Sequence, residues 1–131
     1  MSFGQRKYDR QKPEIEFPEG PVPSELNIVD LIEGDGREVA PGDTVSAHYV
    51  GVAWSSGEEF DSSWNRGAPL DFRVGVGQVI QGWDQGLLGM KLGGRRRLEI
   101  PSDLAYGSRG AGGAIGPNEA LIFVVDLVGI R

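Results

Sequence analysis

The sequence predicts an α+β fold in which an antiparallel sheet curls around one short helix. Its 131 residues, of which 39% are apolar and 24% charged, are typical of a single soluble domain with one hydrophobic core. The 21 glycines separate short apolar runs, which favours strands and turns over long helices. Several of these runs alternate between apolar and polar residues, as strands with one buried face do.

Composition divides the chain at about residue 24. Residues 1–24 hold four of the eight prolines and hardly any aliphatic side chains. Such a segment buries too little apolar surface to offset the entropy lost on ordering. We therefore expect an extended, mobile N-terminal arm over 1–24 and a folded domain over 25–131.

Five segments of the domain are expected to form strands. They are residues 26–32, 44–52, 70–74, 95–100 and 121–127. In the third, Leu70, Phe72 and Val74 share one face, opposite two charged side chains. The fourth begins with Arg95, Arg96 and Arg97, which must point to both faces of the sheet. We interpret these arginines as mainly solvated surface.

Only residues 81–90 resemble a helix. Gly82, Gly86 and Gly89 lie within this segment, and each costs about 1 kcal/mol relative to alanine in a helix. The helix should therefore be short and held in place by packing. Its spacing places Trp83, Leu87 and Leu88 toward the sheet.

Charge and composition exclude several classes of function. The formal net charge of −6 disfavours binding to nucleic acids and to anionic membrane surfaces. The chain has no cysteine and a single histidine, His48, so we expect neither a metal site nor a thiol nucleophile, and a structural role for His48. Dinucleotide-binding, phosphate-loop and nucleophile-elbow motifs are absent, and we expect no cofactor.

No segment resembles a membrane span or a targeting signal. The most apolar run, 120–125, is far shorter than the roughly 20 residues that a spanning helix needs. The first dozen residues lack the apolar region of a secretory signal. We therefore expect a cytoplasmic protein without a membrane segment.

Five aromatic residues lie next to residues that are typical of turns: Tyr49, Phe60, Trp83, Tyr106 and Phe123. Taken alone, they are more typical of an ordinary core than of a binding site. Their local sequences change this interpretation. The segments HYVG (48–51), FDSS (60–63), GQVIQGWDQG (77–86), IPSDLAYG (100–107) and ALIF (120–123) resemble, in that order, the signature segments of the FKBP-type peptidyl-prolyl isomerases. The resemblance covers about residues 25–131.

This resemblance implies a five-stranded antiparallel half-barrel wrapped around a short helix, with an apolar pocket between helix and sheet. Trp83 would form the floor of the pocket. The implied walls are Tyr49, Phe60, Leu70, Val79, Ile80 and Phe123, and Ile115 would lie in the loop that overhangs the pocket. Asp61, Arg66 and Tyr106 would form the polar side, and the Tyr106 hydroxyl and the Ile80 backbone N–H would donate hydrogen bonds to ligand carbonyls. Gln78 would also contact the substrate.

The implied activity is cis–trans isomerisation of X-Pro peptide bonds, which assists protein folding. The implied catalytic residues are Asp61, Trp83, Tyr106 and Phe123, and the implied ligands are proline-containing peptides, folding proteins and the macrolides tacrolimus and rapamycin. No proton has to move in this reaction, so Asp61 would act electrostatically. An ion pair with Arg66 that orients the wall is an equally good interpretation of Asp61. We expect a monomer.

Some positions depart from the pattern common in this family. Leu70 replaces an aromatic wall residue, Gln78 stands where glutamate is common, and Ala111 and Ala114 replace larger side chains. These changes bear on substrate preference and macrolide affinity more than on activity. Two alternatives follow: a non-catalytic module that binds proline motifs or macrolides, and a small β protein that contacts acidic or nucleic-acid partners through residues 95–97.

Overall fold

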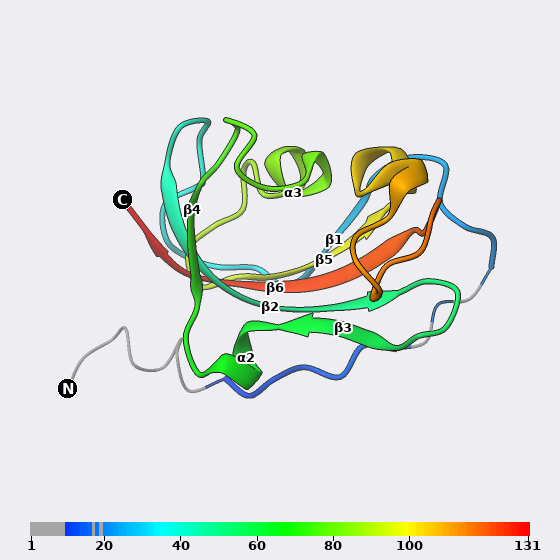
Figure 1. The fold of residues 1–131 in the computed structure, drawn as a ribbon. Helices are drawn as coiled ribbons and strands as arrows, with labels where there is room; N and C mark the ends of the chain where they lie inside the picture. Colours follow the sequence, from blue (N-terminus) through cyan, green and yellow to red (C-terminus); the bar gives the residue numbers. More distant parts are fainter. Residues whose placement is uncertain (1–9, 17, 19) are drawn as a thin grey trace.

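The computed structural model describes residues 10–16, 18 and 20–131, and the rest of the predicted arm lies outside the described residues. Within this part of the chain, six strands form one antiparallel sheet (Figure 1). They are β1 (Asn27–Ile32), β2 (Thr44–Ala53), β3 (Glu59–Ser62), β4 (Leu70–Arg73), β5 (Arg95–Ile100) and β6 (Leu121–Ile130). The α+β class and the curled antiparallel sheet are therefore confirmed.

The strand order is β1-β5-β6-β2-β3, and β4 pairs with β2. The two long central strands, β2 and β6, pair from Val45 opposite Ile130 to Ala53 opposite Leu121. The sheet has one more strand than the five we expected, because β3 was not predicted. Its four residues contain a single apolar side chain, that of Phe60, and so give no alternating pattern.

The helices are short. Helix α3 (Gln81–Gly86) lies across the concave side of the sheet, and α2 (Ser63–Arg66) follows β3 at the opposite side (Figure 1). Two 3₁₀ turns, η1 (Ser102–Leu104) and η2 (Gly107–Arg109), follow β5. Helix α2 was not predicted. Helix α3 ends four residues before the predicted end at Met90, and the chain then turns through Gly89, whose φ is +77°.

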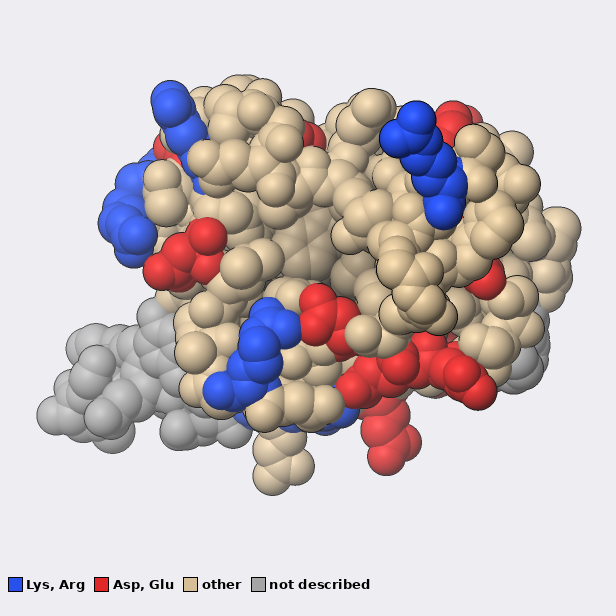
Figure 2. Space-filling view, viewed as in Figure 1, with Lys and Arg blue, Asp and Glu red and all other residues tan. Residues whose placement is uncertain are grey.

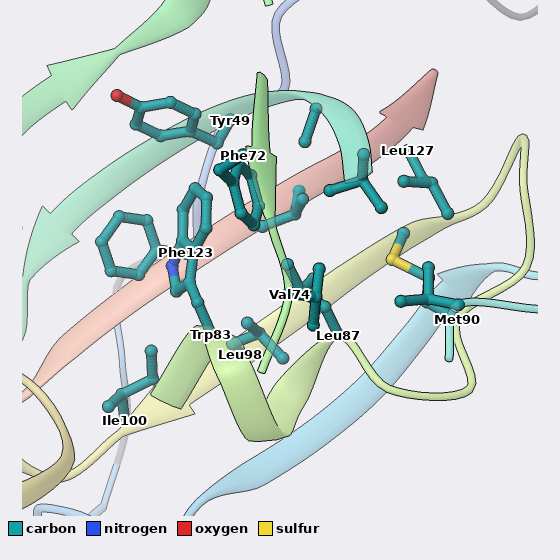
Figure 3. Packing of buried hydrophobic residues seen from close by; sticks show 14 of the residues in the cluster. Tyr49, Phe72, Val74, Trp83, Leu87, Met90, Leu98, Ile100, Phe123 and Leu127 are labelled. Atoms are coloured by element: carbon teal, nitrogen blue, oxygen red, sulfur yellow. The ribbon is translucent and has the colours of Figure 1, made fainter. Parts of the chain in front are cut away.

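The core lies between α3 and the concave face of the sheet (Figure 3). Trp83 and Leu87 are buried there as predicted, whereas Leu88 is 38% exposed because it follows the end of the helix. The glycines of α3 face β5: a Cβ atom at Gly82 would lie 2.5 Å from Ile100 Cγ2. A side chain at this position would push the helix away from the strand.

The described part of the arm lies on the outer face of the sheet, opposite α3 (Figure 1). Arg10 forms an ion pair with Asp126 of β6, and Lys12 forms one with Glu59 of β3 at 2.7 Å. Residues 12–15 line a cavity together with Val50 and other residues of β2 and β3. Along β6, residues 121–128 are buried whichever face of the sheet they point to. The described arm residues thus contact the domain, and the mobility of the arm stays a prediction.

The three arginines of β5 are not mainly solvated, which corrects the sequence-based interpretation. Their side chains are 9–17% exposed, and each pairs with a carboxylate. Arg95 pairs with Asp126 at 2.9 Å and Arg96 with Asp30 at 2.7 Å. Arg96 also donates to the carbonyls of Gly86 and Leu88 at the C-terminal end of α3, where a cation is favourable.

Among the described residues, none of the helices has the length and apolar character that a membrane span requires.

Candidate functional site

Three buried aromatic rings form the centre of the candidate site. The ring of Trp83 lies 5.1 Å from that of Phe123 and 5.0 Å from that of Tyr49, both at nearly perpendicular angles (Figure 3). Phe60 meets Phe123 in the same manner at 5.5 Å. Edge-to-face contacts of this kind fix ring orientations more firmly than aliphatic packing does. The site therefore has a stiff apolar base.

These rings come from four separate elements. Tyr49 lies in β2, Phe60 in β3, Phe123 in β6 and Trp83 in the first turn of α3. Gly51 of β2 lies between two of them, because a Cβ atom there would come within 2.6 Å of Phe123 and 2.7 Å of Phe60. The absence of a side chain at Gly51 is thus what lets both rings approach the same point of the sheet.

The remaining apolar residues predicted for the pocket surround this base. Leu70, Val79 and Ile80 are half-buried and pack against the core cluster, while Ile115 is 5% exposed within it. Reciprocal backbone hydrogen bonds between Ala111 and Ile115 close the loop that carries Ile115. Figure 2 shows the molecular surface hollowed near the centre of the view, with charged side chains below the hollow. Phe72, which sequence analysis did not assign to the site, contacts Trp83 at 5.3 Å.

Two polar side chains hold the segment that leads into α3. Asp84 accepts hydrogen bonds from the backbone N–H groups of Gly75 and Gly77. Gln78 is exposed, and its carbonyl oxygen accepts a hydrogen bond from the Arg73 N–H at 2.8 Å. This carbonyl group therefore supports the turn after β4, and the structure does not bring Gln78 into the aromatic cluster.

A polar network lies beside the rings. The Tyr49 hydroxyl donates to Asp61 Oδ2 at 2.5 Å, and Arg66 donates to Asp61 Oδ1 at 2.7 Å and to the Tyr49 hydroxyl at 2.8 Å. The predicted ion pair between Asp61 and Arg66 is therefore present. The Tyr49 hydroxyl is a third member that sequence analysis had assigned only to the apolar wall, since an aromatic residue in a strand gives no sign of its polar partner.

The hydroxyls of Tyr49 and of Tyr106, which was predicted for the polar side of the pocket, remain protonated at neutral pH. Burial and the hydrogen bond to Asp61 raise the pKa of Tyr49 above its ordinary value. Tyr106 is 40% exposed. Its partial burial, and to a smaller extent the charge of Asp61, raise the pKa of Tyr106 above its ordinary value. The hydroxyl of Tyr106 can therefore donate to a bound carbonyl group.

His48 points to the outer side of the sheet. Its ring stacks on Trp64 at 4.2 Å, and its Nδ1 lies 2.8 Å from the hydroxyl of Ser63. Burial lowers the pKa of His48, and the charge of Asp126 partly offsets this effect. These contacts agree with the structural role expected for His48. Ser63 was not singled out from the sequence, although it belongs to the segment 60–63 that carries the family resemblance.

Comparisons with known proteins agree with this arrangement. Residues 35–128 match the family model described as FKBP-type peptidyl-prolyl cis-trans isomerase. The chain is 64% identical to the FK506-binding protein of Streptomyces anulatus over 92% of this chain and 98% of that protein. It is 54% identical to the peptidyl-prolyl cis-trans isomerase FPR2 of Saccharomyces cerevisiae over 70% of this chain and 67% of that protein. The crystal structure of AtFKBP13 superposes with a TM-score of 0.76 at 45% identity, covering 84% of this chain and 96% of that one.

Proposed function

Because this chain belongs to the FKBP-type peptidyl-prolyl cis-trans isomerase family, we propose that it isomerises X-Pro bonds at the aromatic cluster around Trp83. The observation that carries this assignment is the combination of three buried, edge-to-face rings with a polar network at their side. The rings accept the proline ring, and the polar groups orient the preceding amide.

Desolvation can supply the catalysis. Rotation about a peptide bond costs about 18–20 kcal/mol because resonance gives the C–N bond double-bond character. Resonance is lost at the twisted midpoint, so the amide there is less polar than in either planar form. A dry aromatic pocket binds this midpoint better than the ground state. A difference of about 5 kcal/mol corresponds to about 10³- to 10⁴-fold in rate.

Each side chain then has a distinct role. Trp83 and Phe123 form the base on which the proline ring lies, and the Tyr106 hydroxyl and the Ile80 backbone N–H donate to substrate carbonyl groups. Asp61 acts electrostatically and holds the Tyr49 hydroxyl, because no proton transfer is needed. Its two oxygens are already engaged by Tyr49 and Arg66, which supports this role. The residues around the base complete the walls: Tyr49, Phe60, Leu70, Val79, Ile80 and Ile115.

The substrates proposed are proline-containing peptides and folding proteins, and the inhibitors are macrolides such as tacrolimus. The relative from Streptomyces anulatus is named an FK506-binding protein, which supports the second class. Leu70, Ala111 and Ala114 offer a macrolide less contact than the larger side chains that are common at these positions in the family. We also propose that the protein acts as a monomer, because its net charge of −6 opposes self-association.

Nuclear magnetic resonance titration tests the location of the site. ¹⁵N-labelled protein is titrated in parallel with a short Leu-Pro peptide and with tacrolimus. We expect both ligands to shift the amide signals of Tyr49, Ile80 and Phe123 and the indole signal of Trp83, and each to displace the other. Shifts confined to the outer face of the sheet, around Val50 and Val124, would reject the assignment.

A further inference from the structure

Tyr49 is held at two points by one short stretch of chain. Its hydroxyl bonds to Asp61 and Arg66, which lie just before and at the end of α2. Its backbone N–H donates to the hydroxyl of Ser63, the first residue of α2, at 2.7 Å. The position of α2 on strand β2 therefore determines how the phenol ring and its two polar partners meet.

Ser63 stands where the ladder between β2 and β3 ends. The last pair in the direction of α2 is Val50 opposite Ser62, and the chain then turns into the helix. The Ser63 hydroxyl takes the place of the missing backbone partner. It lies within hydrogen-bonding distance of the Tyr49 N–H, of the Tyr49 carbonyl oxygen at 3.3 Å and of His48 Nδ1 at 2.8 Å. A buried hydroxyl with three partners holds its backbone firmly, because leaving any of them unpaired is unfavourable.

We propose that Ser63 is a positioning residue for isomerisation, whose buried hydroxyl fixes α2 on β2 and thereby sets the Tyr49–Asp61–Arg66 network. This inference rests on the proposed site. Ser63 is fully buried, so it touches no substrate and acts through the network alone. Displacing catalytic groups by a fraction of an ångström lowers rates measurably, because the orienting interactions depend steeply on geometry.

The neighbouring serine provides a matched control. Ser62 is also buried, at 4% exposed, but within the described part of the chain its hydroxyl has no hydrogen-bond partner. Removal of either hydroxyl changes the volume equally. Only the Ser63 change removes contacts to Tyr49.

The test compares kcat/KM of Ser63→Ala and Ser62→Ala on a short proline peptide. We expect Ser63→Ala to lower kcat/KM at least about five-fold, and Ser62→Ala to change it less than about two-fold. The same Ser63→Ala change is made in a Tyr49→Phe background, where the network is already broken. In this background Ser63→Ala should lower kcat/KM less than about two-fold, because the effects of substitutions at interacting residues are not additive. An equal loss in both backgrounds, or full activity of Ser63→Ala, would overturn the proposal.

Two further variants keep the outcome interpretable. Ser63→Cys has a similar shape but a weaker hydrogen-bonding group, so it replaces Ser63→Ala if the alanine variant does not fold. Its kcat/KM should also fall more than that of Ser62→Ala. Trp83→Leu tests the proposed site itself. If Trp83→Leu retains full activity, the proposed site is wrong. If Trp83→Leu loses activity and neither Ser63 variant does, only the positioning role of Ser63 is rejected.

Discussion

Trp83 is the residue on which the proposed site depends most. It contacts Tyr49, Phe72 and Phe123 and is 3% exposed. We predict that Trp83→Leu and Phe123→Leu each lower kcat/KM at least about ten-fold, because the twisted amide loses its apolar base. Isomerase assays together with thermal unfolding check this. A variant that stays folded with undiminished kcat/KM would contradict the assignment.

We predict that His48 makes the free energy of unfolding, but not the rate, depend on pH. Its pKa is lowered in the folded state, so below its unfolded value of 6.5 the unfolded chain binds more protons. The free energy of unfolding should therefore be fully retained above this pH and fall as the pH drops below it. His48→Gln should flatten this dependence. Denaturant unfolding at several pH values measures both curves.

The rate itself should be nearly constant between about pH 6 and 8, because the proposed mechanism requires no group that titrates there. The raised pKa values of Tyr49 and Tyr106 keep both hydroxyls protonated across this range. A bell-shaped profile of kcat/KM over this pH range would be inconsistent with desolvation as the source of catalysis.

At the scale of single residues, sequence reasoning found the rings more easily than their polar partners. Trp83 and Phe123 lie in segments whose pattern is recognisable from local sequence. The bond from Tyr49 to Asp61 joins two strands, and the hydroxyl of Ser63 matters only because β3 ends next to it. Such long-range polar contacts are set by tertiary packing and leave no local pattern.

Among the elements, helix α3 shows how packing overrides helix propensity. Gly82 and Gly86 face β5, and a Cβ atom at Gly86 would lie 2.8 Å from Leu98 Cδ2. Propensity alone predicts that Gly86→Ala stabilises the helix by about 1 kcal/mol. We predict the opposite, a loss of about 1–3 kcal/mol from overpacking.

Chemical denaturation shows whether Gly86→Ala raises or lowers the free energy of unfolding. Gln85→Ala is the matched control, because Gln85 is an exposed residue of the same helix, and it should change the free energy of unfolding by less than about 0.5 kcal/mol. Stabilisation by Gly86→Ala would mean that α3 can move away from β5 without cost.

Alternation predicted most strands, and its absence explains the missed one. Apolar and polar side chains alternate over residues 70–73 and 95–100, which form β4 and β5. Strand β3 was not predicted, because it has only one apolar residue. The burial of Arg96 was also missed. Its partners, Asp30 on β1 and the carbonyls after α3, come together only in the folded sheet.

In the whole molecule, the sheet separates the aromatic site from the described part of the arm. Its concave face carries α3 and the aromatic site, and its outer face is covered by the arm (Figure 1). We predict that deletion of residues 1–24 leaves kcat/KM on a short peptide within about two-fold. The free energy of unfolding should fall by about 1–3 kcal/mol, because Val50 and Val124 lose their cover and Asp126 loses Arg10.

Activity and unfolding are measured on the same preparation of the shortened chain. The full-length protein is the reference for both. A large loss of turnover at a temperature where the shortened chain is folded would show that the arm acts on the site, contrary to its place on the outer face.

The proposed activity is the isomerisation of X-Pro bonds at the aromatic cluster around Trp83. Exchange spectroscopy of a Leu-Pro peptide, with catalytic amounts of the protein, tests it most directly, with tacrolimus added in a second series. We expect faster cis–trans exchange that saturating tacrolimus abolishes. Exchange that the protein does not accelerate, or that remains accelerated at saturating tacrolimus, would contradict it.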